Sequence, residues 1–93
     1  MIWRDIVKEA LINLGGEAYL KDIYNEVVKN NIDLPVNYEA SIRDTLQRNS
    51  SDSKKYNQKV DLFYTVEGMG KGKWGLRDYE PEFKNMDITQ DDT

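Results

Sequence analysis

The chain has 93 residues, enough for one domain, and it contains neither cysteine nor histidine. Those two absences exclude disulfides, thiol chemistry, zinc sites built from thiolate or imidazole ligands, and histidine-based acid–base catalysis. The formal net charge of −4 argues at first sight against a nucleic-acid partner, so the distribution of charge along the chain matters more than its sum.

The same composition bears on location. No apolar run approaches the roughly 20 residues that a membrane-spanning helix needs. The first residues lack the charged region followed by an apolar core that defines a secretion signal. A chain without cysteine is also compatible with a reducing compartment. We therefore expect a cytoplasmic protein with no membrane partner.

The charges are unevenly distributed along the chain. Residues 1–37 carry four basic and six acidic side chains, whereas residues 38–77 carry eight basic and five acidic ones. Residues 78–93 carry one basic and six acidic side chains. The middle of the chain thus has an excess of three positive charges, which fits a DNA-facing half and fits an ordinary solvated surface equally well.

The first half of the sequence has the pattern of two helices separated by a short extended stretch. Apolar residues at helical spacing predict a first helix with one buried face: Trp3, Ile6, Val7, Ala10, Leu11 and Leu14. The pair Gly15-Gly16 ends that helix, and residues 17–20 form the extended stretch. A second helix follows over about residues 21–30. Its buried stripe comprises Ile23, Tyr24, Val27 and Val28.

A loop with Asp33 and Pro35 leads to a third helix, which begins after Asn37 as the N-cap and runs to about residue 49. Only Ile42 and Leu46 are firm core residues there, so most of its surface is free for water or a partner. Residues 50–55 form a polar loop. Residues 62–66 and 74–76 form two strands that pair as a hairpin around the glycine-rich turn at 67–73.

This order of elements predicts an α+β winged-helix domain, three helices plus a β-hairpin wing, over residues 1–79. Residues 80–93 are acidic and have little apolar periodicity, so we expect a linker or a disordered end there. In a winged helix the third helix can enter the major groove of DNA, while the hairpin reaches the flanking backbone.

The third helix supplies the first set of candidate DNA-binding residues. Arginine pairs bidentately with guanine, and glutamine or asparagine with adenine, so these residue types suit base reading. The candidates are Ser41, Gln47 and Arg48 on the outward face, Arg43 on its flank, and Asn37 and Tyr38 at the N-terminal end. A solvated helix face explains the same residues, and the order of elements tips the balance towards recognition.

The wing and the polar loop supply the second set. Lys71 and Lys73 at the hairpin tip are placed to neutralise phosphates, which would make binding weaken steeply with salt. Ser51, Lys54 and Lys55 directly follow the third helix and suit contacts with phosphates and sugars. A turn that carries lysines for solubility and a flexible connector are the alternatives for these two segments.

Catalysis finds no support in the sequence. The glycines of the turn at residues 67–73 are not followed by Gly-Lys-Ser/Thr and lie between strands rather than before a helix, which excludes a nucleotide-binding loop. The carboxylates show no metal-binding spacing, and no nucleophile can be paired with a base. We expect no enzyme activity, no cofactor and no metal. Trp3, Phe63 and Trp74 are assigned to the core, whereas Tyr38, Tyr56 or Tyr64 could stack on a base.

Several stretches together resemble a known group of domains. They are Trp-Arg-Asp-Ile-Val at 3–7, Leu-Lys-Asp-Ile-Tyr at 20–24, Ala-Ser-Ile-Arg-Asp-Thr-Leu-Gln at 40–47, Leu-Phe-Tyr at 62–64 and Gly-Lys-Gly-Lys-Trp-Gly-Leu-Arg at 70–77. The chain resembles the small winged-helix domains that accompany nuclease domains in bacterial restriction endonucleases, including modification-dependent ones. A more distant likeness is the HARE-type helix-turn-helix group. The match covers about residues 2–79.

The resemblance implies binding of double-stranded DNA in a restriction or defence context, with sensing of N6-methyladenine as one variant. By this analogy Ser41, Arg43, Gln47 and Arg48 lie at the major groove, and Lys71 and Lys73 at the DNA backbone. It also implies that any nuclease would be a separate fused or partner domain.

Two rival functions stay open. A winged helix can serve protein–protein contact instead, and the net negative charge and the mixed signs on the third helix favour that adaptor role. An acidic DNA mimic is the more distant rival, because most of the excess acid lies in the tail rather than on the predicted folded part.

Overall fold

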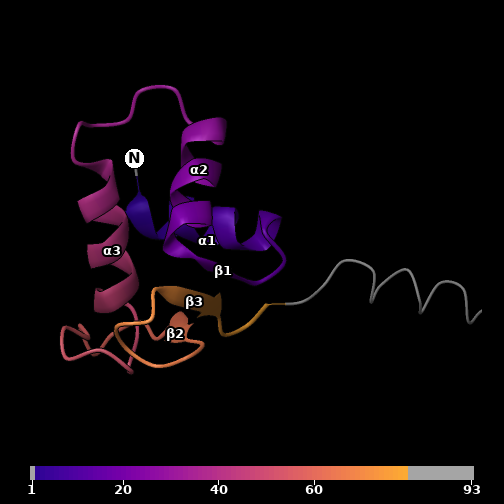
Figure 1. Cartoon of the computed structure of the whole chain (residues 1–93). Coiled ribbons are helices and arrows are strands. Elements are labelled where there is room, and N and C mark those ends of the chain that lie inside the picture. Colours follow the sequence, from indigo (N-terminus) through magenta and orange to yellow (C-terminus); the bar gives the residue numbers. More distant parts are fainter. Residues whose placement is uncertain (1, 80–93) are drawn as a thin grey trace, which may run out of the picture.

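The computed structural model describes residues 2–79, and the predicted acidic tail at 80–93 lies outside the described residues. Three helices pack against a small sheet (Figure 1). In chain order the elements are α1 (Trp3–Asn13), β1 (Glu17–Tyr19), α2 (Leu20–Asn30), α3 (Tyr38–Arg48), β2 (Phe63–Thr65) and β3 (Lys73–Leu76). Within residues 2–79, no helix is long and apolar enough to cross a membrane.

The end of α1 is fixed by two glycines, as the sequence predicts. The Gly15 N–H donates to the Ile12 carbonyl at 3.2 Å, and the Gly16 N–H donates to the Leu11 carbonyl at 2.8 Å. This pair of bonds is the Schellman arrangement, which requires backbone with positive φ just after the helix. Gly15 and Gly16 have φ of +94° and +101°. The glycines therefore both stop α1 and turn the chain into β1.

Helix α2 follows β1 with no intervening loop, and its buried face is narrower than predicted. Ile23 and Val27 are buried and Tyr24 is partly buried. The prediction that Val28 belongs to the buried stripe was wrong, since 47% of this residue is exposed. Consecutive residues of a helix point about 100° apart, and the face of α2 that packs on the core is centred on Ile23 and Val27, which leaves Val28 at its exposed edge.

The sheet is antiparallel with strand order β1–β3–β2. β2 and β3 form the predicted hairpin, with Phe63 opposite Leu76 and Thr65 opposite Trp74. β1 pairs with the other edge of β3, with Ala18 opposite Trp74. The turn between β2 and β3, residues 66–72, is called the wing below. The α+β prediction is confirmed, and this topology is compatible with a winged helix.

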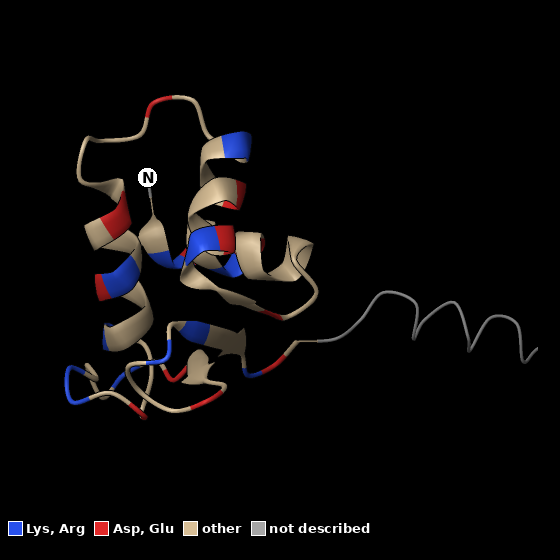
Figure 2. Cartoon of the chain, in the orientation of Figure 1, with Lys and Arg blue, Asp and Glu red and all other residues tan. Residues whose placement is uncertain are grey.

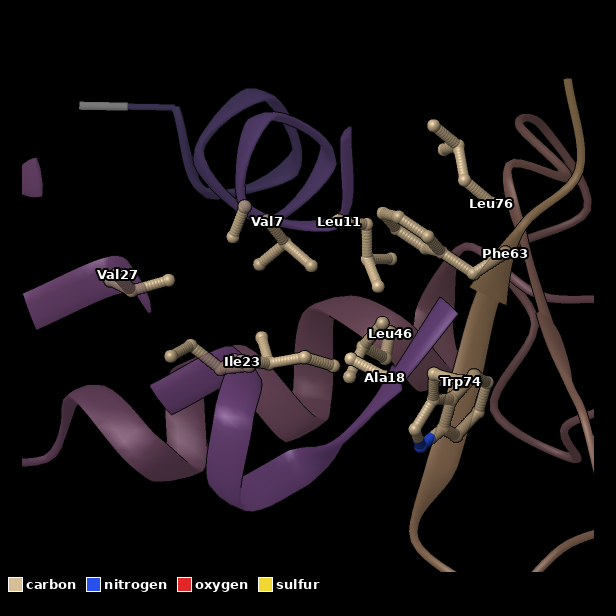
Figure 3. Packing of buried hydrophobic residues seen from close by; sticks show 11 residues of the cluster. Val7, Leu11, Ala18, Ile23, Val27, Leu46, Phe63, Trp74 and Leu76 are labelled. Atoms are coloured by element: carbon tan, nitrogen blue, oxygen red, sulfur yellow. The ribbon is translucent and has the colours of Figure 1, made fainter. Parts of the chain in front are cut away.

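The core lies where the helices meet the sheet (Figure 3). Its centre comprises α1, α2 and α3 residues together with side chains of the sheet: Val7, Ala10, Leu11, Ala18, Ile23, Val27, Ile42, Leu46, Phe63, Trp74 and Leu76. Phe63 and Trp74 are buried and Trp3 packs against the cluster, which confirms their assignment to the core. Burial of Ile42 and Leu46 fixes the rotation of α3 about its axis, so the residues on its other side face outward.

Candidate nucleic-acid interface

Arg48, one of the predicted base-reading residues of α3, is exposed but paired within the helix. The Arg48 side chain is 60% exposed, yet its Nε lies 2.7 Å from Asp44 Oδ2. The pair is spaced i, i+4, which stabilises an exposed helix by only about 0.3–0.5 kcal/mol. Gln47, next to it, is half-buried. Arg48 is thus available to a partner that offers a better acceptor than Asp44.

Arg43 ties α3 to α2 instead of projecting freely. Its guanidinium donates to the Tyr24 hydroxyl at 2.9 Å, and this hydrogen bond raises the pKa of Arg43 above its usual value. The Tyr24 ring in turn meets the Tyr38 ring edge-to-face, with centroids 6.5 Å apart. Arg43 is therefore exposed and charged but held at the seam between the two helices, on the flank of α3 as predicted.

The N-terminal end of α3 differs in detail from the prediction. Asn37 occupies the N-cap position, but its side chain makes no capping hydrogen bond; only its carbonyl accepts from the Ser41 N–H at 3.1 Å. Tyr38 packs on the core, and burial, followed by the nearby Glu39 carboxylate, raises the pKa of its hydroxyl. Ser41 is half-buried and its carbonyl accepts from the Thr45 hydroxyl at 2.7 Å. Asn37 is the exposed member of this group.

The polar segment after α3, residues 49–62, is a loop held in shape by hydrogen bonds; it is called the α3–β2 loop below. Asn49 is its anchor: the buried side-chain amide donates to the Thr45 carbonyl at 2.8 Å, and its oxygen accepts from the Asn57 amide at 3.2 Å. Its backbone carbonyl accepts from the N–H groups of Leu62 and Phe63. The start and the end of the loop are thereby fixed at the last turn of α3.

A second group of bonds joins the α3–β2 loop to the sheet. Asp61 accepts from the N–H and the hydroxyl of Ser51 at 2.8 and 2.7 Å, and from Arg77 Nε at 2.9 Å. These bonds, led by the Ser51 N–H, lower the pKa of Asp61. Asp52 accepts from the Thr65 N–H at 2.9 Å and lies 3.4 Å from Arg77. Ser51, a predicted phosphate contact, therefore already uses its N–H and hydroxyl in hydrogen bonds within the loop.

The predicted backbone-contacting lysines fall into two kinds. Lys54 and Lys55 in the α3–β2 loop and Lys71 in the wing are exposed, and within residues 2–79 they form no ion pair. Lys73, by contrast, does not lie at the hairpin tip: it is the first residue of β3. Its ammonium lies 3.4 Å from Glu17 and 5.2 Å from the centre of the Tyr19 ring, and the Glu17 contact raises the pKa of Lys73.

One further exposed lysine, Lys59, joins this set, although the sequence did not single it out. It lies in the α3–β2 loop and likewise forms no ion pair in the described part of the chain. The sequence shows the charge of Lys59 but not that its loop lies against the end of α3. The Asn57 N–H donates to the Arg48 carbonyl at 2.8 Å. That bond folds the middle of the loop onto the end of α3.

The last turn of α3, the α3–β2 loop and the wing consequently gather at one end of the molecule, where Figure 2 shows blue segments below α3. We call the side chains of Arg48, Lys54, Lys55, Lys59 and Lys71 the basic end. Carboxylates are also present there: Asp44, Asp52 and Asp61 are engaged with Arg48, Arg77 or backbone groups, and the exposed Glu67 of the wing accepts from the Tyr19 hydroxyl at 3.4 Å. The exposed lysines thus outnumber the carboxylates left to face a partner.

Among residues 2–79, no three Asp or Glu side chains gather in a way that could hold a metal ion. No protein-family model matches the chain, and the comparisons with curated proteins and with solved structures found no match either.

Proposed function

We propose that the chain is a winged-helix module that binds double-stranded DNA, with α3 in the major groove and the α3–β2 loop and wing on the flanking phosphates. The observation that carries the proposal is the basic end. Four exposed lysines without carboxylate partners lie in the α3–β2 loop and the wing, and the helix that leads into this loop bears the half-buried Gln47 and the exposed Arg48. Lysines in such positions neutralise phosphates, and the helix side chains suit base edges.

The topology supports the same proposal. Three helices pack against an antiparallel sheet of order β1–β3–β2. A turn of seven residues, 66–72, joins the two strands of the hairpin. Winged helices place their third helix and wing against DNA in this way. The three wing glycines have φ between +77° and +92°, so the turn carries little side-chain bulk between Lys71 and an approaching backbone.

A restriction or defence role, with sensing of N6-methyladenine and a separate nuclease domain, extends this proposal. It is supported by the sequence resemblance described above. No residue of α3 identifies a pocket for a methyl group, so the experiment compares methylated with unmethylated duplexes.

The test is a fluorescence-anisotropy titration of the 93-residue chain against short duplexes, unmodified and N6-adenine-methylated, at two salt concentrations. We expect binding that weakens steeply with salt, because each neutralised phosphate releases counterions. The double variant Lys54→Ala/Lys55→Ala should bind every duplex more weakly and show a flatter salt dependence. A methylation-dependent difference in affinity would support the modification-sensing role.

The matched control is Lys8→Ala/Lys29→Ala, which removes the same charge from exposed positions of α1 and α2 away from the basic end. It should retain most of the affinity. Equal losses in the two double variants would mean that only overall charge matters, and absence of binding at low salt would overturn the DNA proposal.

A protein-binding winged helix is the second candidate, and a specific observation favours it. Both arginines of α3 already have partners, Arg48 in Asp44 and Arg43 in Tyr24, so base reading by an arginine requires one of these contacts to be exchanged. A protein interface would tolerate salt, whereas phosphate contacts would not. Binding of DNA that is insensitive to salt, or none, would shift the assignment to this candidate.

A further inference from the structure

A second surface, between α1 and α2, has the features of a docking groove. It is a hollow of about 260 Å³ whose apolar lining includes the buried Ala10 and Val27 and the half-buried Ile6. None of its lining residues belongs to α3, the α3–β2 loop or the wing, so it is separate from the basic end. Pockets for drug-sized ligands measure about 300–1,000 Å³, so this smaller groove suits a side chain or two of a protein partner better than a metabolite.

The charged side chains that line the groove are all acidic. Asp5 and Glu9 of α1 and Glu26 of α2 line it, and within residues 2–79 none of the three forms an ion pair. Asp5 and Glu9 are spaced i, i+4, an arrangement in which like charges destabilise a helix by about 0.2–0.5 kcal/mol. A cationic partner would relieve that repulsion. Within residues 2–79 no carboxylates gather closely enough to hold a metal ion, these three included.

Two exposed isoleucines lie close to groove residues along the chain. Ile2 directly precedes α1 and is 59% exposed, and Ile32 follows the groove residue Asn31 and is 96% exposed. The Ile2 carbonyl accepts from the N–H groups of Asp5 and Ile6, which keeps Ile2 at the first turn of α1 beside the groove. An apolar stripe flanked by carboxylates complements a segment that combines aliphatic side chains with lysine or arginine.

We propose that this groove binds a basic amphipathic segment of a partner protein, the aliphatic parts resting on Ile6, Ala10 and Val27 and the cationic heads meeting Asp5, Glu9 and Glu26. Lysine and arginine suit such a site because their stems cover apolar surface while their heads reach charge. DNA is repelled by the same carboxylates. The groove and the basic end therefore serve different partners, and the two can be occupied together.

The test uses a designed helical peptide with leucine at i and i+4 and lysine at the flanking positions, beside a peptide with glutamate in place of every lysine. Titration into the ¹⁵N-labelled chain should shift amide signals of residues 5–10 and 26–32, with the lysine peptide only. The double variant Glu9→Gln/Glu26→Gln should bind the lysine peptide about fivefold more weakly, since each exposed charge pair contributes up to about 1 kcal/mol.

The matched control is Asp22→Asn/Asp33→Asn, which removes the same charge at exposed positions that do not line the groove. It should bind the lysine peptide as the parent chain does. Equal weakening in both double variants, shifts spread over the whole surface, or no binding would each overturn the groove proposal. Duplex binding by Glu9→Gln/Glu26→Gln is measured alongside, so failure of the groove and failure of the DNA interface give different results.

Discussion

Gly15 and Gly16 show how two neighbouring glycines differ in what they do. A Cβ at Gly15 would meet nothing within 4 Å, whereas a Cβ at Gly16 would lie 2.6 Å from the Tyr79 ring. We predict that Gly15→Ala lowers the free energy of unfolding by about 1 kcal/mol, the cost of positive φ in a residue with a side chain. Gly16→Ala should cost more, about 2 kcal/mol or more, because the ring must also move.

Denaturant unfolding of both variants measures this difference. Equal losses at the two positions would mean that the Tyr79 ring moves away at no cost.

Asp61 makes the stability of the domain depend on pH. Because its bonds to Ser51 and Arg77 lower the pKa of Asp61 in the folded state, its contribution is fully present above the ordinary aspartate pKa of about 3.9. The contribution is lost as the pH falls from there through the lowered folded pKa. We predict that Asp61→Asn melts below the parent chain at pH 7 and that the gap narrows below about pH 4.

Melting temperatures from pH 2 to 7 test this prediction, with Asp78→Asn as the control, since that exposed carboxylate makes no ion pair in the described residues. A gap of constant size across the range would rule out the linkage to Asp61.

At the scale of elements, Arg48 of α3 can exchange its partner Asp44 for an acceptor on a bound molecule. Breaking the Arg48–Asp44 pair by Asp44→Asn should strengthen DNA binding a few-fold, because it frees Arg48 and removes a negative charge from the helix face. Arg48→Ala should instead weaken binding by about 1–3 kcal/mol and relax sequence preference, the cost of a lost bidentate base contact. Anisotropy titrations against duplexes of different sequence distinguish the two variants. Weaker binding by Asp44→Asn would show that the pair positions Arg48 rather than withholding it.

Helices and strands could be predicted from the sequence because their signals are local. The spacing of Val7, Ala10 and Leu11 and the two glycines after Leu14 are enough to define α1. The inner structure of the α3–β2 loop could not be predicted, because its bonds join distant residues: Ser51 to Asp61, and Asp61 to Arg77, which lie 10 and 16 residues apart. Such pairings depend on the sheet being formed.

In the candidate site, too, residue types and loop positions could be predicted, whereas contacts between distant residues could not. Lys54, Lys55 and Lys71 could be named from their residue types and loop positions, and the structure leaves them exposed. The position of Lys73 was missed because the start of β3 depends on pairing with both of its neighbours, Tyr19 of β1 among them. The hydrogen bond of Arg43 to Tyr24 could not be inferred without the packing of α3 on α2, whereas the i, i+4 spacing of Asp44 and Arg48 is visible in the sequence.

At the scale of the whole molecule, the excess negative charge is concentrated in the last residues of the chain. Residues 80–93 carry five acidic and one basic side chain, so they account for the whole net charge of −4. We predict that a chain ending at residue 79 binds duplex DNA several-fold more tightly at low salt, since a long-range repulsion is removed. The difference should vanish at high salt. Equal affinities at low salt would show that the tail charge does not reach the interface.

The strand order β1–β3–β2 also has a consequence for synthesis on the ribosome. Among the described elements the central strand, Lys73–Leu76, is the last to emerge, and both edge strands remain unpaired until it does. Until then the apolar side chains of α1, β1 and β2 that pack around Trp74 and Leu76 have no sheet to close over them. The nascent domain therefore passes through most of its translation with an incomplete core, a state in which exposed apolar surface and unpaired edges favour chaperone contact and aggregation.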